Sequence, residues 1–363
     1  MRVLHVEGGA RLYGGAQQVL YLLEGLAARS IENHLACRRG CDLAARAAPF
    51  AAVQEMPMGG DLDLAIIPRL YRLIRRLRPD LVHLHSRIGA DVMGGIAARL
   101  AAVPVVHTRR VDNPEPRWLV AVKYRLHDRV IAISNGIAEV LRAKGLPESK
   151  LRVVRSAINV EPFAQPCRRE QVVHQLGLTA DSILIGVVAQ LIPRKGHAVL
   201  LRAAPALLAE RPRLHIAFFG QGPLAASLKQ QIDAAGLGGR VHLMGFRDDL
   251  PSIFPCLRLL VHPALMEGLG VSLLQGAAAA VPVVASDVGG IPEAVSDEVT
   301  GLLVPPGDAD ALARAIRRLL ADESLSRRFG AAGAERILRE FSVDAMVAGN
   351  LAVYRELVGD DCP

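Results

Sequence analysis

The chain has 363 residues and a formal net charge of +7, with 51% hydrophobic and 4% aromatic residues. This length exceeds one ordinary core, so we expect two domains. No apolar run reaches about 18 residues, and the first residues lack the long apolar core of a secretory signal. We therefore expect neither a transmembrane helix nor a signal peptide.

The first half of the chain alternates strands with helices. We expect strands over 2–7, 80–85, 103–108 and 129–134, and helices over 16–29, 67–79 and 90–102. Such alternation is typical of a parallel, doubly wound α/β sheet.

The second half repeats this order. We expect strands over 183–190, 214–220, 241–245, 257–263 and 281–286, and helices over 196–210, 223–235 and 309–321. Between the halves, the segment 156–170 is rich in polar residues and proline, as linkers are. We place the first domain at 1–160 and the second at 171–340.

Glycines and isolated polar residues follow the predicted strands. In parallel sheets, ligands bind at the carboxyl ends of the strands, and these positions collect there: Gly14, Gly15, His85, His107, Lys195, Gly220, Gly222, Glu267, Gly268 and Gly270. Their clustering indicates a ligand site more strongly than any single motif does.

Two glycine-containing turns precede helices. The turn "GGARLYGG" (8–15) lacks the dinucleotide pattern G-x-G-x-x-G, and no Walker motif occurs in the chain. Free N–H groups at a helix start still favour a phosphate. The alternative interpretation is a tight turn with positive φ at Gly14-Gly15, and a capped, buried αβ unit without chemistry at 266–290.

Single polar residues have structural alternatives as well. Lys195 could neutralise a leaving pyrophosphate, with Arg194 beside it, or it could be a solvated loop lysine. His85 and His107 end strands, where a core or capping histidine is the commoner case. The cysteines Cys37, Cys41, Cys167, Cys256 and Cys362 show no metal spacing, and we interpret them as free thiols.

Positive charge is concentrated in the first half. Residues 1–165 hold 24 Lys+Arg against 15 Asp+Glu, a net +9, and the remaining 19 against 21 give −2. The predicted helix 67–79 carries Arg72, Arg75, Arg76 and Arg78. Without an aromatic-interleaved basic stripe or a zinc pattern, nucleic acid is not the expected partner. An anionic lipid or a phosphorylated glycan fits this charge, and a solubilising surface is the structural alternative.

The motifs together resemble the retaining glycosyltransferases of family four, which have the GT-B fold of two Rossmann-like domains facing across a cleft. The likeness is strongest in "HPALMEGLGVSLLQGAAAAVPVVASDVGGIPEAV" and "TGLLVPPGD". It extends to "LIPRKG", "GQGPL", "PDLVHLHS" and "VIAISNGIAEVL". The segment 341–358 resembles the final helix of that fold, which crosses back to the first domain.

The resemblance implies roles for individual residues. Glu267 matches the acid that holds the donor sugar, and Lys195 the lysine that contacts the diphosphate. Gly15 matches a loop glycine near the phosphate. Together with the positions after the strands, these matches lead us to predict Lys195 and Glu267 as catalytic. The predicted donor-binding set is Gly15, Gln190, Arg194, Lys195, Gly220, Glu267, Gly268, Leu269, Gly270, Val271 and Gln275, and the predicted acceptor-side set is Gly14, His85, His107, Arg109 and Arg110.

Three single residues depart from the family pattern, and at the linker "SAIN" stands where the family usually shows Asn-Gly-x-Asp. Gln275 stands where the family has a second acid, which holds the nucleotide ribose. Gln190 replaces an arginine that helps to bind the diphosphate. Arg110 falls where the family has a histidine.

The resemblance implies a retaining glycosyltransferase that uses a nucleotide-sugar donor and a glycan or lipid-linked acceptor, in cell-envelope polysaccharide or lipopolysaccharide synthesis. We expect no metal or other cofactor. We expect a cytoplasmic location, with peripheral attachment to an anionic membrane surface. A sugar-nucleotide epimerase of the same fold and a non-catalytic nucleotide-sugar-binding protein remain alternatives, whereas the missing fingerprint disfavours a nicotinamide dehydrogenase.

Overall fold

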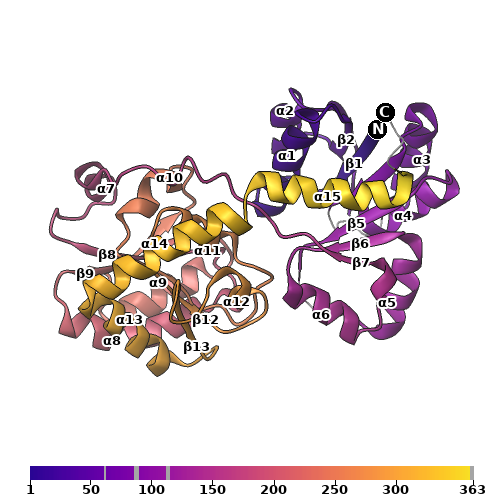
Figure 1. The fold of residues 1–363 in the computed structure, drawn as a ribbon. Helices are drawn as coiled ribbons and strands as arrows, with labels where there is room; N and C mark the ends of the chain where they lie inside the picture. Colours follow the sequence, from indigo (N-terminus) through magenta and orange to yellow (C-terminus); the bar gives the residue numbers. More distant parts are fainter. Residues whose placement is uncertain (61–62, 86–89, 112–114, 360–363) are drawn as a thin grey trace. The chain divides into compact units, whose positions relative to one another are not determined.

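The computed structural model describes residues 1–60, 63–85, 90–111 and 115–359, which form two compact units (Figure 1). Unit 1 comprises residues 1–157 and 343–363, and unit 2 comprises residues 158–342. The predicted linker 156–170 therefore lies almost entirely in unit 2. Cys362 lies outside the described residues.

Unit 1 is built on a parallel sheet of seven strands in the order β3-β2-β1-β4-β5-β6-β7. The strands are β1 (Arg2–Glu7), β2 (Glu32–Arg38), β3 (Ala52–Met56), β4 (Leu81–Leu84), β5 (Val105–Arg109), β6 (Arg129–Ala132) and β7 (Leu151–Val153). The chain order reverses between β1 and β4, so their carboxyl ends form the switch point of this sheet.

Helices cover both faces of the sheet in unit 1. They are α1 (Gly14–Ala27), α2 (Asp42–Ala47), α3 (Ile66–Leu77), α4 (Ala90–Leu100), α5 (Arg117–Lys123), α6 (Asn135–Ala143) and α15 (Val343–Val358). Helices α3 to α6 pack against one face, and α1, α2 and α15 against the other. Side chains alternate between these faces along each strand.

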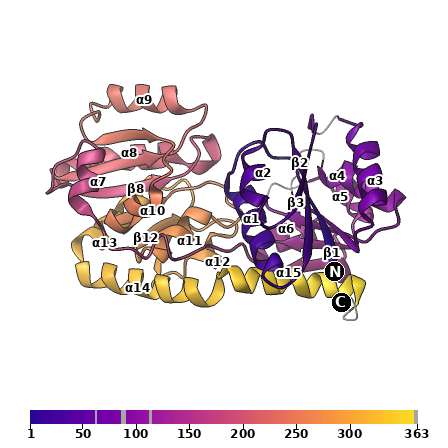
Figure 2. The same ribbon diagram turned by 90° about the horizontal axis from the view of Figure 1, so that it is seen from above.

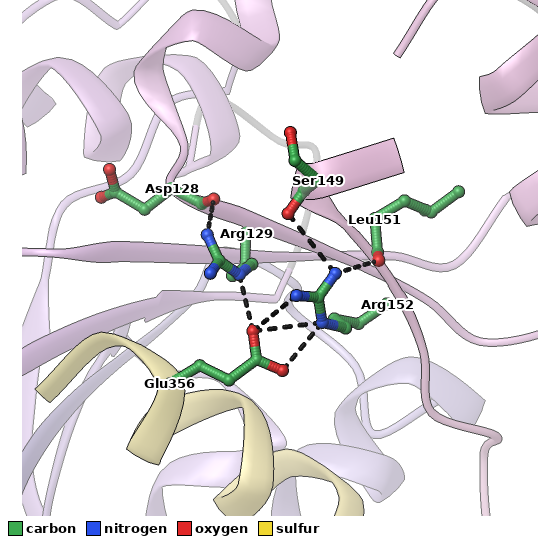
Figure 3. A network of polar contacts seen from close by, with 6 residues as sticks. All are labelled: Asp128, Arg129, Ser149, Leu151, Arg152 and Glu356. Carbon is green, nitrogen blue, oxygen red and sulfur yellow. Dashed lines mark hydrogen bonds and ion pairs between the residues drawn. The ribbon is translucent and has the colours of Figure 1, made fainter. Parts of the chain in front are cut away.

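The carboxy-terminal helix α15 packs beside α1, although some 300 residues of sequence separate them (Figure 2). Near its end, the carboxylate of Glu356 contacts the guanidinium of Arg129 at 2.8 Å and that of Arg152 at 2.7 Å (Figure 3). Further inside, the hydroxyl of Tyr354 hydrogen-bonds Nδ1 of His83 at 2.6 Å. These contacts make the last helix part of the unit that contains the first strand.

Unit 2 contains a parallel sheet of six strands in the order β10-β9-β8-β11-β12-β13. The strands are β8 (Ile183–Val188), β9 (Leu214–Phe219), β10 (Val241–Gly245), β11 (Leu259–His262), β12 (Val283–Ser286) and β13 (Gly301–Val304). Here the switch point lies between β8 and β11. The two doubly wound parallel sheets expected from the sequence are thus confirmed.

The helices of unit 2 also form two layers. They are α7 (Arg169–Gln175), α8 (His197–Glu210), α9 (Ala225–Ala234), α10 (Leu250–Ile253), α11 (Val271–Ala278), α12 (Ile291–Ala294), α13 (Ala309–Ala321) and α14 (Glu323–Glu340). Helices α8, α9 and α13 cover one face, and α7, α10, α11 and α12 cover the other. Helix α14 contributes side chains to both cores.

The structure corrects the expectation that all cysteines are free thiols. Cys167 and Cys256 form a disulfide that joins residues 89 positions apart, whereas Cys37 and Cys41 are free and buried. Sequence spacing gave no indication of the pair, because the fold alone brings the segment before α7 next to the turn before β11.

Strand β2 was not predicted, because its sequence "ENHLACR" mixes polar and apolar residues. It is nevertheless buried over most of its length. Asn33 is tolerated inside because its side-chain amide donates to the carbonyl oxygens of Leu23 at 3.0 Å and Phe50 at 3.2 Å. The two hydrogen bonds that the amide nitrogen donates thus offset part of the cost of burying this polar side chain in a strand.

Helix α3 ends at Leu77, two residues before the predicted limit. Arg78 adopts a left-handed conformation with φ of 47° and caps the helix, so three of the four predicted arginines lie on it. Arg72, Arg75 and Arg76 are exposed. Within the described residues, no helix combines the length and apolarity that crossing a bilayer requires.

Candidate active site

A cluster of charged groups in direct contact lies at the switch point of unit 2. The loop after β8 carries Lys195, and the loop after β11 carries Glu267, and these two strands are neighbours in the sheet. The ammonium of Lys195 forms an ion pair with Oε2 of Glu267. The predicted proximity of the two residues to one strand edge is therefore realised as a direct contact.

Glu267 has further partners that hold it in place. Nε2 of His262, the last residue of β11, lies 2.8 Å from the same oxygen, Oε2. The backbone N–H of Gly268 donates to Oε1 at 3.1 Å. On the other side of the imidazole, the hydroxyl of Ser272 lies 3.5 Å from Nδ1. The carboxylate is therefore held by contacts that run from the end of β11, through His262, to Ser272 on α11.

These partners keep Glu267 ionised although it is 8% exposed. Burial by itself raises its pKa, but the hydrogen bonds and positive charge supplied by His262 and Lys195 outweigh burial and hold the pKa well below the ordinary value. A buried carboxylate at a ligand edge can accept hydrogen bonds from hydroxyl groups more strongly than a neutral acceptor can.

Two glycines bring the loops of this edge into contact. A Cβ atom at Gly196 would lie 1.8 Å from the carbonyl oxygen of Pro263, and one at Gly220 would lie 2.0 Å from that of Ala189. Both glycines also have positive φ, 68° and 148°. The backbone N–H of Leu265 donates to the carbonyl of Arg194 at 2.7 Å. Glycine is thus required where the loops carrying Lys195 and Glu267 meet.

The amino-terminal end of α11 follows directly. Gly270 adopts φ of 82° as its N-cap, and no side chain caps the helix. The first backbone N–H groups of α11 are therefore not satisfied by a capping side chain, and they carry the positive end of the helix dipole. Val271 and Gln275 are one turn apart on the less buried stripe of this helix.

The other residues predicted to bind the donor lie on the adjoining loops. Leu269 is buried at 2% exposure and packs in the core, so only its backbone can face a ligand. Gln190 is exposed at the end of the β8 strand, and Arg194 is partly exposed beside Lys195. Gly222 lies against the carbonyl of Leu191.

In unit 1, Gly14 and Gly15 begin helix α1. Neither has a positive φ, so the tight-turn interpretation is wrong for this pair. The helix has no side-chain cap, because Tyr13 occupies the N-cap. A Cβ atom at Gly15 would lie 3.5 Å from Cδ of Arg110, so the arginine side chain lies against the start of α1.

Arg110 combines burial with charge. Burial lowers the pKa of its guanidinium to about 10, while the negative charge of Glu7 opposes this shift. Its Nε has no hydrogen-bond partner among the described residues. At neutral pH it is a cation at the end of β5, suited to an anionic group.

The structure corrects the acceptor-side assignment of His107 and Arg109. Strand β5 extends to Arg109, so side-chain alternation turns both residues toward α4 and α5, whereas Thr108 and Arg110 face α1 and α15. His107 is 0% exposed, and Arg109 is 2% exposed and forms an ion pair with Glu115 at 3.2 Å. Both belong to the interior of unit 1.

His85 is also buried, at 2% exposure, directly after β4. Its Nε2 lies 2.9 Å from Nδ1 of His5, and its ring stacks on that imidazole. His83 joins the cluster, with Thr108 and Tyr354 on its two ring nitrogens at 2.6 Å each. Burial lowers the pKa of all three imidazoles, so they are neutral.

The three histidines His5, His83 and His85 are the one group in the described residues with metal-ligand spacing, their ligand atoms lying within 4.8 Å of one another. Both nitrogens of His83 are already hydrogen-bonded. Protein hydrogen bonds therefore satisfy this member of the cluster without a metal.

Sequence reasoning missed His262. The signal was present, since the residue ends a buried strand five positions before Glu267. It also missed the buried network in which Lys123 contacts Asp91 at 2.6 Å and Glu115 at 3.1 Å. In that case no local pattern exists, because the three residues come from separate segments.

Comparison with known families matches both halves of the chain. A family model described as Glycosyltransferase Family 4 matches residues 13–162, and one described as Glycosyl transferases group 1 matches residues 168–336. The second match contains Lys195, Glu267 and Gln275.

Individual relatives agree. The chain is 32% identical over 309 residues to an alpha-maltose-1-phosphate synthase of Mycolicibacterium smegmatis, covering 76% of this chain and 79% of the relative. It is 28% identical over 280 residues to a UDP-Gal:alpha-D-GlcNAc-diphosphoundecaprenol alpha-1,3-galactosyltransferase of Escherichia coli, covering 73% and 72%. The structure of Anabaena Alr3699/HepE in complex with UDP is similar with a TM-score of 0.86 at 20% identity, covering 98% and 100%.

Proposed function

Because the chain belongs to the GT-B glycosyltransferases that resemble family four, we propose that it transfers a sugar from a nucleotide-sugar donor to a glycan or lipid-linked acceptor with retention of configuration. The observation that carries the proposal is the contact of Lys195, Glu267 and His262 beside the start of α11.

The donor site follows from the hydrogen-bonding capacity of this cluster. Lysine has three N–H donors, and one contacts Glu267, so two remain for the oxygens of a diphosphate. Oε1 of Glu267 accepts only the Gly268 N–H among its described contacts and has capacity for sugar hydroxyls. The amides of Gly268, Leu269, Gly270 and Val271 would face sugar and diphosphate, and Gln275 would bind the ribose.

In the proposed reaction, the bond between the anomeric carbon and the diphosphate oxygen breaks toward an oxocarbenium-like state. Lys195, with Arg194, and the α11 amides stabilise the negative charge that develops on the leaving diphosphate. The acceptor hydroxyl attacks the same face of the sugar, and its proton passes to the leaving phosphate. These protein groups supply the positive charge, so we propose that activity does not depend on a divalent cation.

The nature of the acceptor is proposed from unit 1 and from one relative. Arg110 presents a cation at the end of β5, next to Gly15. The Escherichia coli relative is named for a diphosphoundecaprenol-linked acceptor. We propose a phosphate-bearing, lipid-linked acceptor of cell-envelope polysaccharide or lipopolysaccharide synthesis.

We propose that the enzyme acts in the cytoplasm, at an anionic membrane surface. The exposed arginines Arg72, Arg75 and Arg76, together with Arg78, provide the basic surface, and Arg72 and Arg76 line a cavity of about 240 Å³ with Arg69. Each basic residue near an anionic surface contributes about 1 kcal/mol. Their replacement by glutamine should weaken salt-sensitive vesicle binding but leave transfer to a soluble acceptor unchanged.

A thermal-shift panel of UDP-, GDP- and ADP-sugars tests the donor. A ligand at 100 times its Kd stabilises the folded protein by about 2.7 kcal/mol. Stabilisation by a nucleotide sugar, followed by acceptor-dependent product whose anomeric configuration equals that of the donor, supports the proposal. Turnover without an acceptor would indicate an epimerase, binding without turnover a non-catalytic protein, and inversion would contradict retention. Activity lost in EDTA would contradict metal independence.

A further inference from the structure

Helix α5 of unit 1 exposes apolar side chains on its outer surface. On its inner side, Val120 and Lys123 are buried, as is Tyr124, which follows the helix. On the outer side, Trp118 is 69% exposed and Val122 is 59% exposed. These residues are four positions apart and thus lie on the same helix face.

The apolar pair is flanked by positive charge. Residues 116–127 contain three basic residues and no acidic residue. Lys123 is turned inward, and the other two, Arg117 and Arg125, are exposed. The outer surface of this segment is therefore an exposed tryptophan and valine between two guanidinium groups, a combination typical of helices that lie in a membrane interface.

The exposure of Trp118 is a fixed property of the fold. The inward Lys123 pairs with Asp91 on α4 and with Glu115, both buried. Arg117 donates to the carbonyl oxygen of Ala143 at the end of α6, at 3.2 Å. The helix is thus held on both sides, and its apolar face cannot turn inward without breaking a buried ion pair.

Helices α5 and α3 cover the same face of the sheet in unit 1. Helix α4 lies between them, packing against α3 and against the turn Tyr124–Leu126 that follows α5. The exposed arginines of α3 and the exposed Trp118 therefore belong to one helical layer. Two separate segments of that layer carry features that suit an anionic bilayer.

We propose that Trp118 and Val122 insert into the interfacial region of an anionic lipid bilayer, with Arg117 and Arg125 at the level of the headgroup phosphates. Tryptophan suits this position because its ring is apolar and its N–H still finds a hydrogen-bond acceptor there. The inference rests on the proposed lipid-linked acceptor and extends it. The arginines of α3 attract the protein to the surface, and α5 anchors it.

The chain contains a single tryptophan, so its intrinsic tryptophan fluorescence reports on α5 alone. The full chain is mixed with vesicles of phosphatidylcholine, with and without about one third phosphatidylglycerol. Insertion predicts that the emission of Trp118 shifts to shorter wavelength with the anionic vesicles only. It also predicts quenching by lipids brominated on the acyl chains.

Substitution of Trp118 tests whether this side chain anchors the protein to the vesicle. Trp118→Ser should weaken vesicle binding in sedimentation by about tenfold, as expected for the loss of one large apolar contact. Phe246→Ser is a matched control, because Phe246 is a 60% exposed aromatic residue of unit 2. It should bind vesicles like the parent.

Unshifted Trp118 emission with anionic vesicles, or equal sedimentation of Trp118→Ser and the parent, would overturn the proposal. An equal shift with neutral and anionic vesicles would overturn the role of charge. Nucleotide-sugar binding and transfer to a soluble acceptor are measured in parallel with Trp118→Ser. Neither activity requires a membrane. If the parent protein shows neither nucleotide-sugar binding nor transfer, the proposed function is contradicted, whatever the vesicle measurements show.

Discussion

The two switch points of the molecule have the same topology and different chemistry. In unit 2, the ends of β8 and β11 lead to an ionised carboxylate, Glu267, held by Lys195 and His262. In unit 1, His5 within β1 and His85, which follows β4, place neutral, buried imidazoles beside each other. The parallel sheet fixes where neighbouring strands and their loops converge, and the residues at those positions decide whether charge or neutral hydrogen bonding is placed there.

Buried charge in unit 1 has a different setting. Lys123 on α5 and Arg109, the last residue of β5, are paired with Asp91 and Glu115, and all four side chains are buried against α4 and α5. The difference teaches that a buried ion pair indicates a site only when it lies at a ligand-binding edge. Elsewhere its removal should affect folding alone.

The largest effect is expected for Lys123→Met. Loss of the ammonium leaves Asp91 and Glu115 buried with less positive charge nearby, which costs about 3–5 kcal/mol of unfolding free energy. Urea denaturation measures this loss. Lys229→Met removes an exposed ion pair with Asp233 and should cost less than about 1 kcal/mol. Equal unfolding free energies for the two variants would contradict the claim that the buried ion pair stabilises the fold more than the exposed one.

A smaller loss of stability is expected for Tyr354→Phe. The change removes the hydroxyl that bonds Nδ1 of His83 and leaves that nitrogen buried without a partner, at a cost of about 1–3 kcal/mol. Thermal unfolding gives the loss. Nucleotide-sugar affinity should be unchanged, since this cluster belongs to unit 1. A variant that folds normally but fails to bind the donor would contradict the division of roles.

Changes at Gln275 should alter affinity without altering stability. Gln275→Leu removes the hydrogen bond that we propose to the ribose and should weaken donor binding by about two- to tenfold. Gln275→Glu should keep or tighten it, since a carboxylate accepts stronger hydrogen bonds from hydroxyls. Calorimetry that shows no response to either change would place the ribose elsewhere.

The smallest effect concerns the attachment of α15. Arg152 and Arg129 lower the pKa of Glu356 to about 2. Because the folded pKa lies below the ordinary value near 4.5, the stabilisation is present above pH 4.5 and is lost as the pH falls toward 2. Glu356→Gln should cost less than about 1 kcal/mol at neutral pH, since the group is partly exposed. If the difference in unfolding free energy between Glu356→Gln and the parent persisted at pH 2, the ion pairs of Glu356 would not be its cause.

The sequence predicted the two parallel sheets because buried parallel strands are short apolar runs between helices. It also predicted that Lys195 and Glu267 follow strands at one edge. Their direct contact could not be predicted, because it depends on the strand order that makes β8 and β11 neighbours and on the close approach at Gly196.

The errors at β5 have a physical cause as well. The predicted strand ended at residue 108, so Arg109 was taken as a loop residue beside Arg110. The observed strand includes Arg109, and alternation sends the two arginines to opposite faces. An error of one residue in the predicted end of a strand was thus enough to assign the interior residue Arg109 to a ligand site.

The central claim is that the Lys195–Glu267 pair serves the donor diphosphate. Its most direct test is kcat for sugar transfer by Lys195→Ala, with Lys229→Ala, an exposed ion-paired lysine of the same unit, as the control. Loss of one electrostatic contact to the leaving group predicts a fall in kcat of about 10² to 10³ for Lys195→Ala, with the fold retained, and no change for Lys229→Ala. A folded Lys195→Ala variant with kcat within about a factor of two of the parent would contradict the claim.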